Sequence, residues 1–393
     1  MIEPISIAAA IVGFLLTAGS AAWTWIAMRS RATYSLLEKL ERRGVQTSEL
    51  VSVIIPGRNV EKWVRGCLGR VLSQKNVLTE VIFVDDSSSD GTGRIVQSEF
   101  VGRGVRYLRL EEVPEGWRGK TWAVSKGYEV SRGDVLLFLD ADTRLHDDFV
   151  VADSVATLME RGLDALSLMP RLDRSSISSK LMLPLLWNIF LALFPPTRGN
   201  DPRDPFAVLF GAFILVRREA YERVGGHYAV RDRLLEDRAL AQLLKGRGFR
   251  IMVLRGSQRV TAEYAGSLVG YFNAIQRIAA DYAATRDAGR LPIYTAGSIL
   301  FLLLPQATLL LSLIVASIPL LLLSLVNIGA NLAANLLEML RDDARREVVY
   351  LPLTLLANWV LAAALLKSCL ALRRGGVTLT WRGRRLTIGL PQV

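Results

Sequence analysis

The sequence predicts an α/β domain with a mostly parallel sheet and helices on both of its faces, joined to helices that are apolar enough to cross a membrane. Two observations carry this prediction. From residue 51 onward, short apolar runs alternate with helical stretches, which is the pattern of repeated β-α units. The composition is also divided, because 51% of the residues are hydrophobic while 22% are charged. These values are too apolar for a purely soluble protein and too polar for a pure membrane bundle.

Five strands are expected in a domain that extends from residue 51 to residue 255: 51–55, 80–85, 105–109, 134–139 and 164–169. Helical stretches lie between them, at 60–72, 92–100, 121–129 and 149–160. No Gly-x-Gly-x-x-Gly motif follows the first strand and the sequence has no P-loop motif, which argues against a dinucleotide-binding or NTPase domain.

An uncharged stretch near the N-terminus, residues 5–28, is long enough for a membrane-spanning helix, which needs about 20 residues. A secretory signal is the alternative, but no basic region precedes the apolar run. Lys and Arg residues follow it, and the positive-inside rule then places the next part of the chain in the cytoplasm. We therefore expect an uncleaved transmembrane anchor at 1–28 and a basic juxtamembrane segment at 29–50.

A second apolar stretch, residues 179–196, is short and is interrupted by Pro184. Segments of this length are more often interfacial or buried than spanning. We expect this stretch to lie in the membrane interface, with a buried core helix as the alternative.

The C-terminal part begins with an amphipathic connector at 256–295, and a transmembrane region is expected at 296–372. Residues 296–337 carry no charge and fit one kinked span or a two-span hairpin, and residues 350–372 fit a further span. Arginines then dominate the tail at 373–393, which favours a cytoplasmic C-terminus and hence about three spans in all.

The net charge and the few cysteine and histidine residues limit the partners and metal sites that we expect for this protein. A net charge of +11 suits nucleic acid, anionic lipid or phosphorylated substrates. We find no helix-turn-helix, zinc-finger or RNA-binding pattern, so we expect membrane lipid and phosphates rather than nucleic acid as partners. The two cysteines lie far apart and imply no disulfide framework. The two histidines, His146 and His227, exclude a multi-histidine metal site and are expected to be solvated or locally hydrogen-bonded.

Asp140 and Asp142 directly follow the most apolar predicted strand. Open α/β sheets place their ligands at the carboxyl ends of strands, and in an extended chain residues i and i+2 point the same way. Two neighbouring carboxylates repel each other unless a cation lies between them. Mg²⁺ or Mn²⁺, held by one or two carboxylates and substrate phosphate oxygens, is the natural cation. The alternative is an acidic turn that caps the helix beginning near Asp147.

Two other loops carry polar groups at strand or helix ends. After the second strand, Asp85 and Asp86 lead into a hydroxyl-rich loop whose carboxylates can accept hydrogen bonds from a base or ribose. Helix capping would explain Ser89 or Asp90 in this loop, but not the two earlier acids. Lys120 follows a glycine just before a helix, which suits a diphosphate; a surface turn with a solvated cation is the alternative.

The order of these motifs resembles that of family 2 glycosyltransferases, whose GT-A fold is Rossmann-like. The resemblance covers residues 51–255 and rests on Val-Ser-Val-Ile-Ile-Pro-x-Arg-Asn, Val-Asp-Asp-Ser-Ser-Ser-Asp-Gly-Thr, Gly-Lys-x-x-Ala, Asp-Ala-Asp and Glu-Asp. The Gly-Trp-x-Gly-Lys-x-Trp-Ala loop at 116–123 is most similar to a membrane-bound subgroup associated with carotenoid and hopanoid glycosylation. The resemblance implies an inverting glycosyltransferase. Together with the apolar spans and the positive-inside rule, we expect a multi-pass cell-membrane protein with a cytoplasmic catalytic domain. Its substrates would be a UDP- or GDP-linked sugar and a lipid acceptor.

The resemblance also implies roles for single residues. The donor-nucleotide side would comprise Pro56, Arg58, Asp86, Lys120 and Asp140. The metal site would comprise Asp140 and Asp142. The acceptor side would comprise Gly211, Arg217 and Gly226. The catalytic residues would be Asp237 and Glu236, which match the Glu-Asp helix start, and Asp237 is the expected general base. In isolation, acids at a helix N-terminus only complement its dipole.

The sequence departs from the family pattern at two places. Polysaccharide synthases carry Gln-x-x-Arg-Trp after the Glu-Asp helix, whereas Gln276 here is followed by no Arg-Trp pair. This difference favours transfer of a single sugar over polymer synthesis. Ser87 also replaces the usual glycine of the nucleotide loop. The alternatives are a metal-dependent nucleotidyltransferase and a non-enzymatic membrane scaffold with a degenerate transferase domain.

Overall fold

The computed structural model describes residues 4–283, 291–341, 344–374, 376–381 and 384–389. The chain forms two compact units. The sheet unit comprises Leu36–Asp173 and Pro196–Tyr264, and the helical unit comprises Met1–Ser35, Arg174–Pro195 and Ala265–Val393. The sheet unit thus extends beyond the expected range of 51–255 at both ends, while the apolar stretch near residue 180 belongs to the helical unit.

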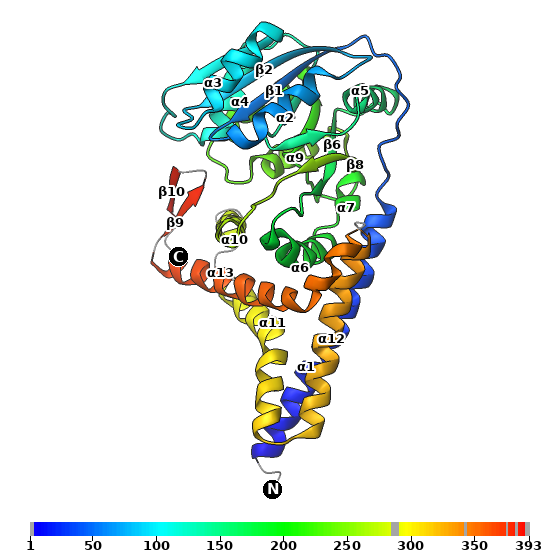
Figure 1. The fold of residues 1–393 in the computed structure, drawn as a ribbon, viewed down its shortest axis with the longest axis vertical. Coiled ribbons are helices and arrows are strands. Elements are labelled where there is room, and N and C mark those ends of the chain that lie inside the picture. The colour runs from blue at the N-terminus through cyan, green and yellow to red at the C-terminus, as the bar shows by residue number, and fades with distance from the viewer. Residues whose placement is uncertain (1–3, 284–290, 342–343, 375, 382–383, 390–393) are drawn as a thin grey trace. The chain divides into compact units, whose positions relative to one another are not determined.

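The sheet unit is built on one mixed sheet of eight strands, in the order β3-β2-β1-β4-β7-β6-β8-β5 (Figure 1). The strands are β1 (Leu50–Gly57), β2 (Leu78–Asp86), β3 (Val105–Leu110), β4 (Val135–Leu139), β5 (Thr143–Leu145), β6 (Ala165–Leu172), β7 (Phe213–Arg217) and β8 (Ile251–Ala262). Strands β3, β2, β1 and β4 are parallel, whereas β7 is antiparallel to both of its neighbours, β4 and β6. The predicted α/β class with a mostly parallel sheet is confirmed.

Helices accompany the strands of this unit, as the alternating pattern predicts. They are α2 (Glu61–Leu72), α3 (Thr92–Glu99), α4 (Gly119–Glu129), α5 (Val150–Glu160), α7 (Pro196–Asn200), α8 (Arg218–Arg223) and α9 (Glu236–Gly246). All five residues of β4 are buried, as are residues 51–55 of β1, because a sheet covered on both faces needs continuous apolar strands. Each fully buried Val, Leu or Ile side chain contributes about 1.5–3 kcal/mol relative to exposure.

A close backbone approach at Gly133 sets the position of β4 beside β1. The N–H of Gly133 donates to the hydroxyl of Ser52 at 2.7 Å. A Cβ atom at Gly133 would lie 2.5 Å from the carbonyl oxygen of Leu50, so only glycine fits there. The strands pair from Val51 opposite Val135 onward, and their carboxyl ends therefore reach the same edge of the sheet.

A partly buried cluster of ion pairs around Arg259 joins several segments of the sheet unit. The guanidinium of Arg259, on β8, bonds both carboxylate oxygens of Asp147 at 2.6 and 2.9 Å and Asp153 at 2.6 Å. Asp153 also accepts the backbone N–H of Gly44 at 2.8 Å. One guanidinium thus connects β8, the loop before α5, α5 itself and the segment that leads into β1.

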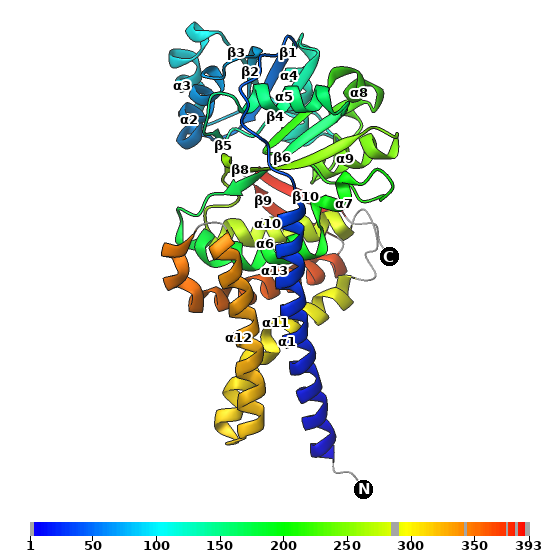
Figure 2. The same cartoon turned by 90° about the vertical axis from the view of Figure 1, so that its right-hand side faces the viewer.

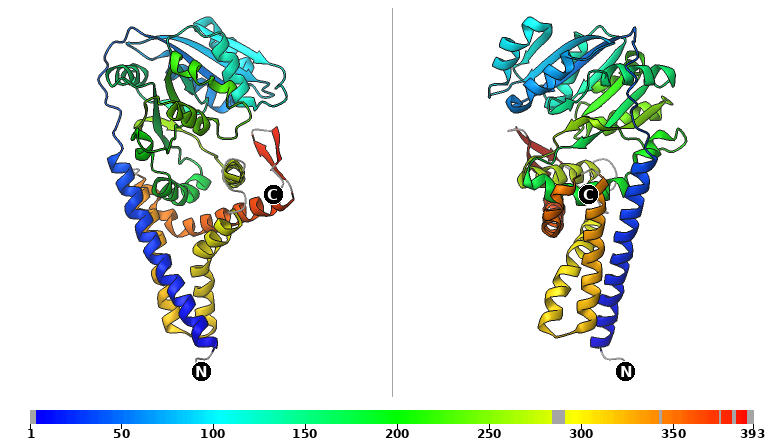
Figure 3. Two further views of the ribbon diagram at one scale, coloured as in Figure 1. Left: turned by 180° about the vertical axis from the view of Figure 1, so that it is seen from behind. Right: turned by 45° about the vertical axis from the view of Figure 1, so that its right-hand side comes forward.

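The helical unit contains α1 (Pro4–Leu36), α6 (Ile177–Leu193), α10 (Leu268–Tyr282), α11 (Leu291–Ile314), α12 (Ile318–Arg341), η5 (Arg345–Thr354) and α13 (Leu355–Arg373). Figures 2 and 3 show α1, α11 and α12 running side by side. Two contacts hold them together: Trp23 stacks on Phe301 with ring centroids 4.7 Å apart, and the amide of Asn327 donates to the Leu16 carbonyl at 2.8 Å.

By length and composition, five helices of the described chain are suited to cross a membrane, compared with about three predicted. They are Ile7–Leu36, Ile177–Asn200, Pro292–Ile314, Ile318–Arg341 and Arg345–Ala371. The range 296–337 holds two helices, because the chain turns at 315–317, where Ala316 has a φ of 52°. The hairpin alternative therefore describes this range. An interfacial place for 179–196 stays a prediction.

Several expected boundaries shift. β8 extends through Arg255 to Ala262, so the first part of the expected connector at 256–295 is a strand of the sheet. The described part of the tail at 373–393 contains a hairpin of β9 (Gly376–Trp381) and β10 (Arg384–Gly389). Parts of the predicted anchor, connector, C-terminal region and tail lie outside the described residues, namely 1–3, 284–290, 342–343, 375, 382–383 and 390–393.

Candidate active site

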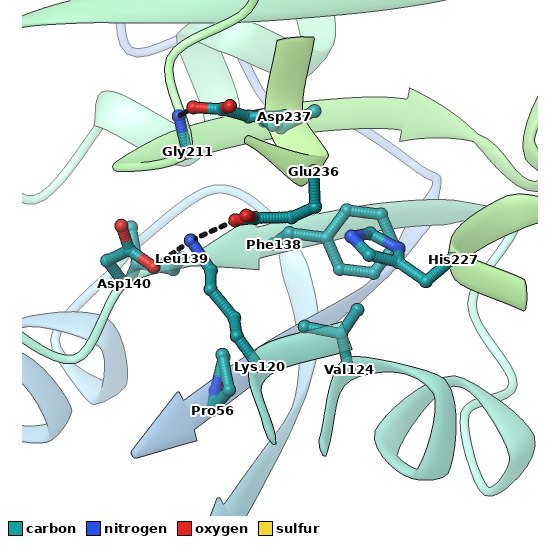
Figure 4. Close-up of a pocket in the computed structure, with 11 residues that line it drawn as sticks. Pro56, Lys120, Val124, Phe138, Leu139, Asp140, Gly211, His227, Glu236 and Asp237 are labelled. Carbon is teal, nitrogen blue, oxygen red and sulfur yellow. Dashed lines mark hydrogen bonds and ion pairs between the residues drawn. The ribbon is translucent and has the colours of Figure 1, made fainter. Parts of the chain in front are cut away.

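A pocket opens at the edge of the sheet where β1 and β4 end (Figure 4). Because β7 is antiparallel to β4, its beginning reaches the same edge. The pocket is lined by Pro56, Lys120, Val124, Phe138, Leu139, Asp140, Gly211, Ile214, His227, Glu236 and Asp237. The structure thus brings together six of the predicted site residues: Pro56, Lys120, Asp140, Gly211, Glu236 and Asp237.

Lys120 is the electrostatic centre of this pocket. Its Nζ lies 2.7 Å from Oδ1 of Asp140 and 2.7 Å from Oε1 of Glu236. Desolvation by itself disfavours the ammonium, but the negative charges of Asp140, Glu236 and Asp237 outweigh it and raise the pKa of Lys120 above its ordinary value. Lys120 is therefore a permanent cation between the strand-end carboxylate and the start of α9.

The local sequence fixes the position of Lys120. It is the second residue of α4, and the backbone N–H of Arg118 just before the helix donates to the carbonyl of Arg231 at 2.8 Å. The hydroxyl of Thr121 donates to the same carbonyl at 2.7 Å. The Gly-Lys-Thr turn is thus held against the loop that precedes α9, and Lys120 is directed toward Glu236.

Asp237 approaches the backbone of Gly211. Its Oδ2 accepts the N–H of Gly211 at 3.1 Å, while Oδ1 accepts the N–H of Arg238 at 2.7 Å. A Cβ atom at Gly211 would lie 3.0 Å from Nζ of Lys120 and 3.2 Å from Oδ2 of Asp237. Glycine at this position therefore lets the lysine and the carboxylate share one small space.

The predicted metal site has carboxylates, which are suitable ligands for Mg²⁺ or Mn²⁺. The backbone that carries them is not the extended chain that we expected. Residues 140–142 form a turn, in which the N–H of Thr143 donates to the Asp140 carbonyl at 2.9 Å. The extended-chain argument for parallel side chains fails there, since β4 ends at Leu139. Asp140 lines the pocket and Asp142 is not among its lining residues. Burial, and then the negative charges of Asp142 and Asp140, raise the pKa of the Cys67 thiol. Both carboxylates therefore lie within electrostatic reach of this thiol.

The described residues contain no group of three or more His, Cys, Asp or Glu side chains arranged to hold a metal ion. Two carboxylates supply hard oxygen ligands but leave most of an octahedral shell open. This set fits Mg²⁺ or Mn²⁺ completed by phosphate oxygens and water, and it does not fit a metal site made by protein side chains alone.

Arg58 follows the pocket residue Pro56 closely in the chain. Neither Arg58 nor the loop after β2 is among the residues that line the pocket. Nη1 of Arg58 donates to the carbonyls of Asp86 and Ser87 at 2.7 and 3.1 Å. Ser87 has a φ of 53°, in the left-handed region that glycine favours. Asp85 is fully buried and bonds Tyr107 at 2.6 Å, so it supports the loop rather than facing a ligand.

Two predicted acceptor-side residues lie elsewhere. Arg217 pairs with Val135 at the beginning of β4, at the edge of the sheet opposite Asp140, and donates to the Leu163 carbonyl at 2.8 Å. Gly211 precedes β7 and Arg217 ends it, so the length of the strand separates the two residues. Gly226 has a φ of 49° and its Cβ would collide with the ring of Tyr221, so it supports the backbone before His227.

His227 is the ionisable residue of the pocket that is not among the predicted site residues. It is buried, and its ring meets Phe138 edge to face with centroids 4.9 Å apart. Burial lowers its pKa to about 4, so the imidazole is neutral at physiological pH. The only sequence signal is its place after Gly225 and Gly226. The expectation of a locally hydrogen-bonded side chain agrees with its bond to Tyr221 at 2.9 Å.

The family model "Glycosyl transferase family 2" matches residues 52–225. The 4,4'-diaponeurosporenoate glycosyltransferase of Staphylococcus haemolyticus is 34% identical over 131 residues, which cover 33% of this chain and 34% of that protein. The protein of the same name from Staphylococcus aureus strain USA300 is 28% identical over 220 residues, covering 52% and 54% of the two chains. The chain therefore spans between a third and about half the length of these curated relatives.

Among solved structures, the chain is similar to mannosyltransferase PcManGT from Pyrobaculum calidifontis, solved in complex with GDP-Man and Mn2+. The TM-score is 0.54 at 18% sequence identity, and the match covers 92% of this chain and 97% of that one. At this identity the likeness concerns the fold, and it agrees with the predicted GT-A type.

Proposed function

We propose, on the basis of the glycosyl transferase family 2 domain that residues 52–225 form, that this chain is an inverting glycosyltransferase. It transfers a single sugar from a nucleoside-diphosphate sugar to a lipid acceptor. The observation that carries the proposal is the arrangement of one cation and three carboxylates around Gly211. Lys120 bonds Asp140 and Glu236 at 2.7 Å each, and Asp237 approaches Gly211 from the other side.

We assign proton transfer to one side of the pocket and stabilisation of the leaving diphosphate to the other. In the reaction, the acceptor hydroxyl attacks the anomeric carbon, its proton passes to a carboxylate of the protein, and the bond from that carbon to the diphosphate oxygen breaks. The carboxylate of Asp237 takes the proton. The ammonium of Lys120 meets the negative charge that develops on the departing diphosphate.

Glu236 has a different task from its neighbour. Its carboxylate is committed to Lys120, so we assign it to holding the lysine in place instead of to proton transfer. Asp140 and Asp142 would hold the Mg²⁺ or Mn²⁺, and a divalent cation bound there supplies further charge to stabilise the leaving diphosphate.

The acceptor assignment rests on the helical unit and on the relatives. Five helices of the described chain are suited to cross a membrane, and both relatives are named for glycosylation of 4,4'-diaponeurosporenoate. We therefore propose an apolar, membrane-dissolved acceptor, a cell-membrane location and a cytoplasmic sheet unit, where nucleotide sugars are available. The donor is a UDP- or GDP-linked sugar; the similar solved structure holds GDP-Man with Mn2+.

A thermal-shift screen of the detergent-purified full chain tests this function. UDP-, GDP- and dTDP-sugars are each added with and without Mn²⁺, because a ligand that binds only the folded state raises the melting temperature. We expect one nucleotide class to raise it in a metal-dependent way, followed by sugar transfer to lipid extract. Binding of none of these donors would contradict the proposal and favour a non-enzymatic scaffold.

A further inference from the structure

The hydrogen bonds around His227 determine which of its ring nitrogens carries the proton. The backbone N–H of His227 donates to the hydroxyl oxygen of Tyr221 at 2.9 Å, and the same hydroxyl lies 2.9 Å from Nδ1 of the ring. A backbone N–H can only donate, so the hydroxyl accepts that bond. The hydroxyl proton of Tyr221 is then left with Nδ1 as its acceptor, because Tyr221 is buried and has these two hydrogen-bond partners among the described residues.

The tautomer of His227 follows from this geometry. A neutral imidazole carries one N–H, and Nδ1 is occupied as an acceptor, so the proton resides on Nε2. Burial lowers the pKa of His227 to about 4, which keeps the ring in this neutral form at physiological pH. Within the part of the chain that the structure describes, Nε2 has no hydrogen-bond partner. A fixed N–H donor therefore remains for a ligand.

This donor belongs to the pocket. His227 is one of the lining residues, and its imidazole lies beside Phe138 on the side of Glu236 (Figure 4). The charges of Glu236 and Lys120 both act on its pKa, which places the ring within their electrostatic reach. The ring cannot turn away easily, because Tyr221 and Phe138 hold it on two sides.

The chemistry of the proposed reaction indicates which part of the donor meets His227. The diphosphate must approach Lys120 and Asp140, and the anomeric carbon must lie between them and Asp237. We place the sugar ring against the remaining lining residues, which include His227 and Phe138. A sugar ring offers hydroxyl oxygens as hydrogen-bond acceptors and a neutral N–H suits them, whereas the diphosphate already has a cation.

We propose that the Nε2–H of His227 donates a hydrogen bond to one hydroxyl group of the donor sugar and thereby selects the sugar. The inference rests on the proposed function and adds a specificity-determining residue to it. Tyr221 is the positioning residue, since its hydroxyl fixes the tautomer. A site that holds an N–H donor disfavours a sugar lacking the matching hydroxyl, because the donor is then left unpaired.

The test compares the preferred nucleotide sugar with its monodeoxy analogues, each lacking one hydroxyl. Wild-type protein should lose about 10- to 100-fold in kcat/KM with one particular analogue. His227→Phe keeps an aromatic ring against Phe138 but removes the donor. We expect this variant to process the parent sugar as poorly as that analogue and to make no distinction between the two. Its affinity for the free nucleoside diphosphate should equal that of wild type.

Matched variants keep the test sharp. His227→Gln retains an N–H near the position of Nε2 and should keep part of the discrimination between the parent sugar and its analogue. This variant provides a test even if His227→Phe does not fold. His146→Gln, which changes the exposed histidine bonded to Thr261, should behave like wild type. The inference is overturned if wild type treats all monodeoxy analogues like the parent sugar, or if His227→Phe weakens nucleoside diphosphate and nucleotide sugar equally. Failure of wild type to bind any nucleotide sugar would instead refute the proposed function.

Discussion

The backbone N–H of Gly211 donates to Oδ2 of Asp237 at 3.1 Å, which holds the proposed base at the beginning of β7. The same glycine leaves room for Nζ of Lys120, which a Cβ atom would approach to 3.0 Å. The sides of the pocket that we propose to accept the proton and to bind the diphosphate thus meet at a residue without a side chain.

Gly211→Ala should impair catalysis while leaving the fold intact. The added methyl group would press on both Lys120 and Asp237, so their relative position must change. We expect kcat to fall at least about 10-fold, because small displacements of reacting groups are costly, with a melting temperature close to wild type. The control is Gly199→Ala, where a Cβ atom meets only Val208 at ordinary contact distances of 3.6–3.9 Å. Equal turnover in the two variants would contradict the crowding at Gly211.

Lys120→Met should abolish most of the affinity for a nucleoside diphosphate. The variant removes the cation that bonds Asp140 and Glu236, and it leaves their like charges to repel each other and the ligand. Calorimetric titration should show a loss of about 10- to 100-fold or more, since hydrogen bonds to charged groups contribute about 1.5–3 kcal/mol each. Lys120→Arg should retain part of the affinity.

Lys126→Met is the matched control for that experiment. Lys126 lies on the same helix, α4, but pairs with the half-exposed Glu129. Its replacement should leave nucleotide affinity unchanged. If Lys120→Met binds as tightly as Lys126→Met, Lys120 does not contact the diphosphate.

His227 should make the fold less stable in acid. Its folded pKa of about 4 lies below its ordinary value of 6.5, so the unfolded chain takes up a proton in this range and the folded chain does not. By linkage, stability is complete above pH 6.5 and falls as the pH falls toward 4, by roughly 3 kcal/mol in total. Glu236 and Lys120 also face this histidine, so the comparison has to be made against a variant.

Unfolding of wild type and His227→Phe in detergent, followed from pH 7.5 to 4.5, measures this contribution. The difference in unfolding free energy between the two proteins should move in favour of the variant as the pH falls. Two parallel stability curves would show that His227 is protonated equally easily in the folded and unfolded chain.

Local sequence patterns were sufficient to predict the core strands of the sheet and about half of the residues that line the pocket. The continuous apolar runs of β1 and β4 identify buried parallel strands, because side chains on both faces must leave water. Asp140 follows from its place after such a strand, and Lys120 from its glycine before a helix. These predictions depend only on residues that are close together in the sequence.

Other features depend on pairings between distant residues. The place of Arg217, at the other end of β7 from Gly211, follows from the direction of β7 relative to β4, which is set by the whole topology and leaves no local signal. The role of His227 depends on Tyr221 and Phe138, which meet it only in the fold. One kinked span and a two-span hairpin both stayed open for 296–337, because this uncharged range gives no sign of where its chain reverses.

Transfer of sugar by Asp237→Asn tests the central claim most directly. Asparagine keeps the size of the side chain but cannot take a proton, so transfer to the lipid acceptor should fall by about 10²- to 10⁴-fold. Donor affinity should stay within about threefold of wild type, because the proposed contacts to the diphosphate come from Lys120 and from a metal ion at Asp140, not from Asp237. Asp232→Asn, which changes an exposed acid in the loop before α9, is the control and should transfer normally. Near-normal turnover by Asp237→Asn would contradict the account.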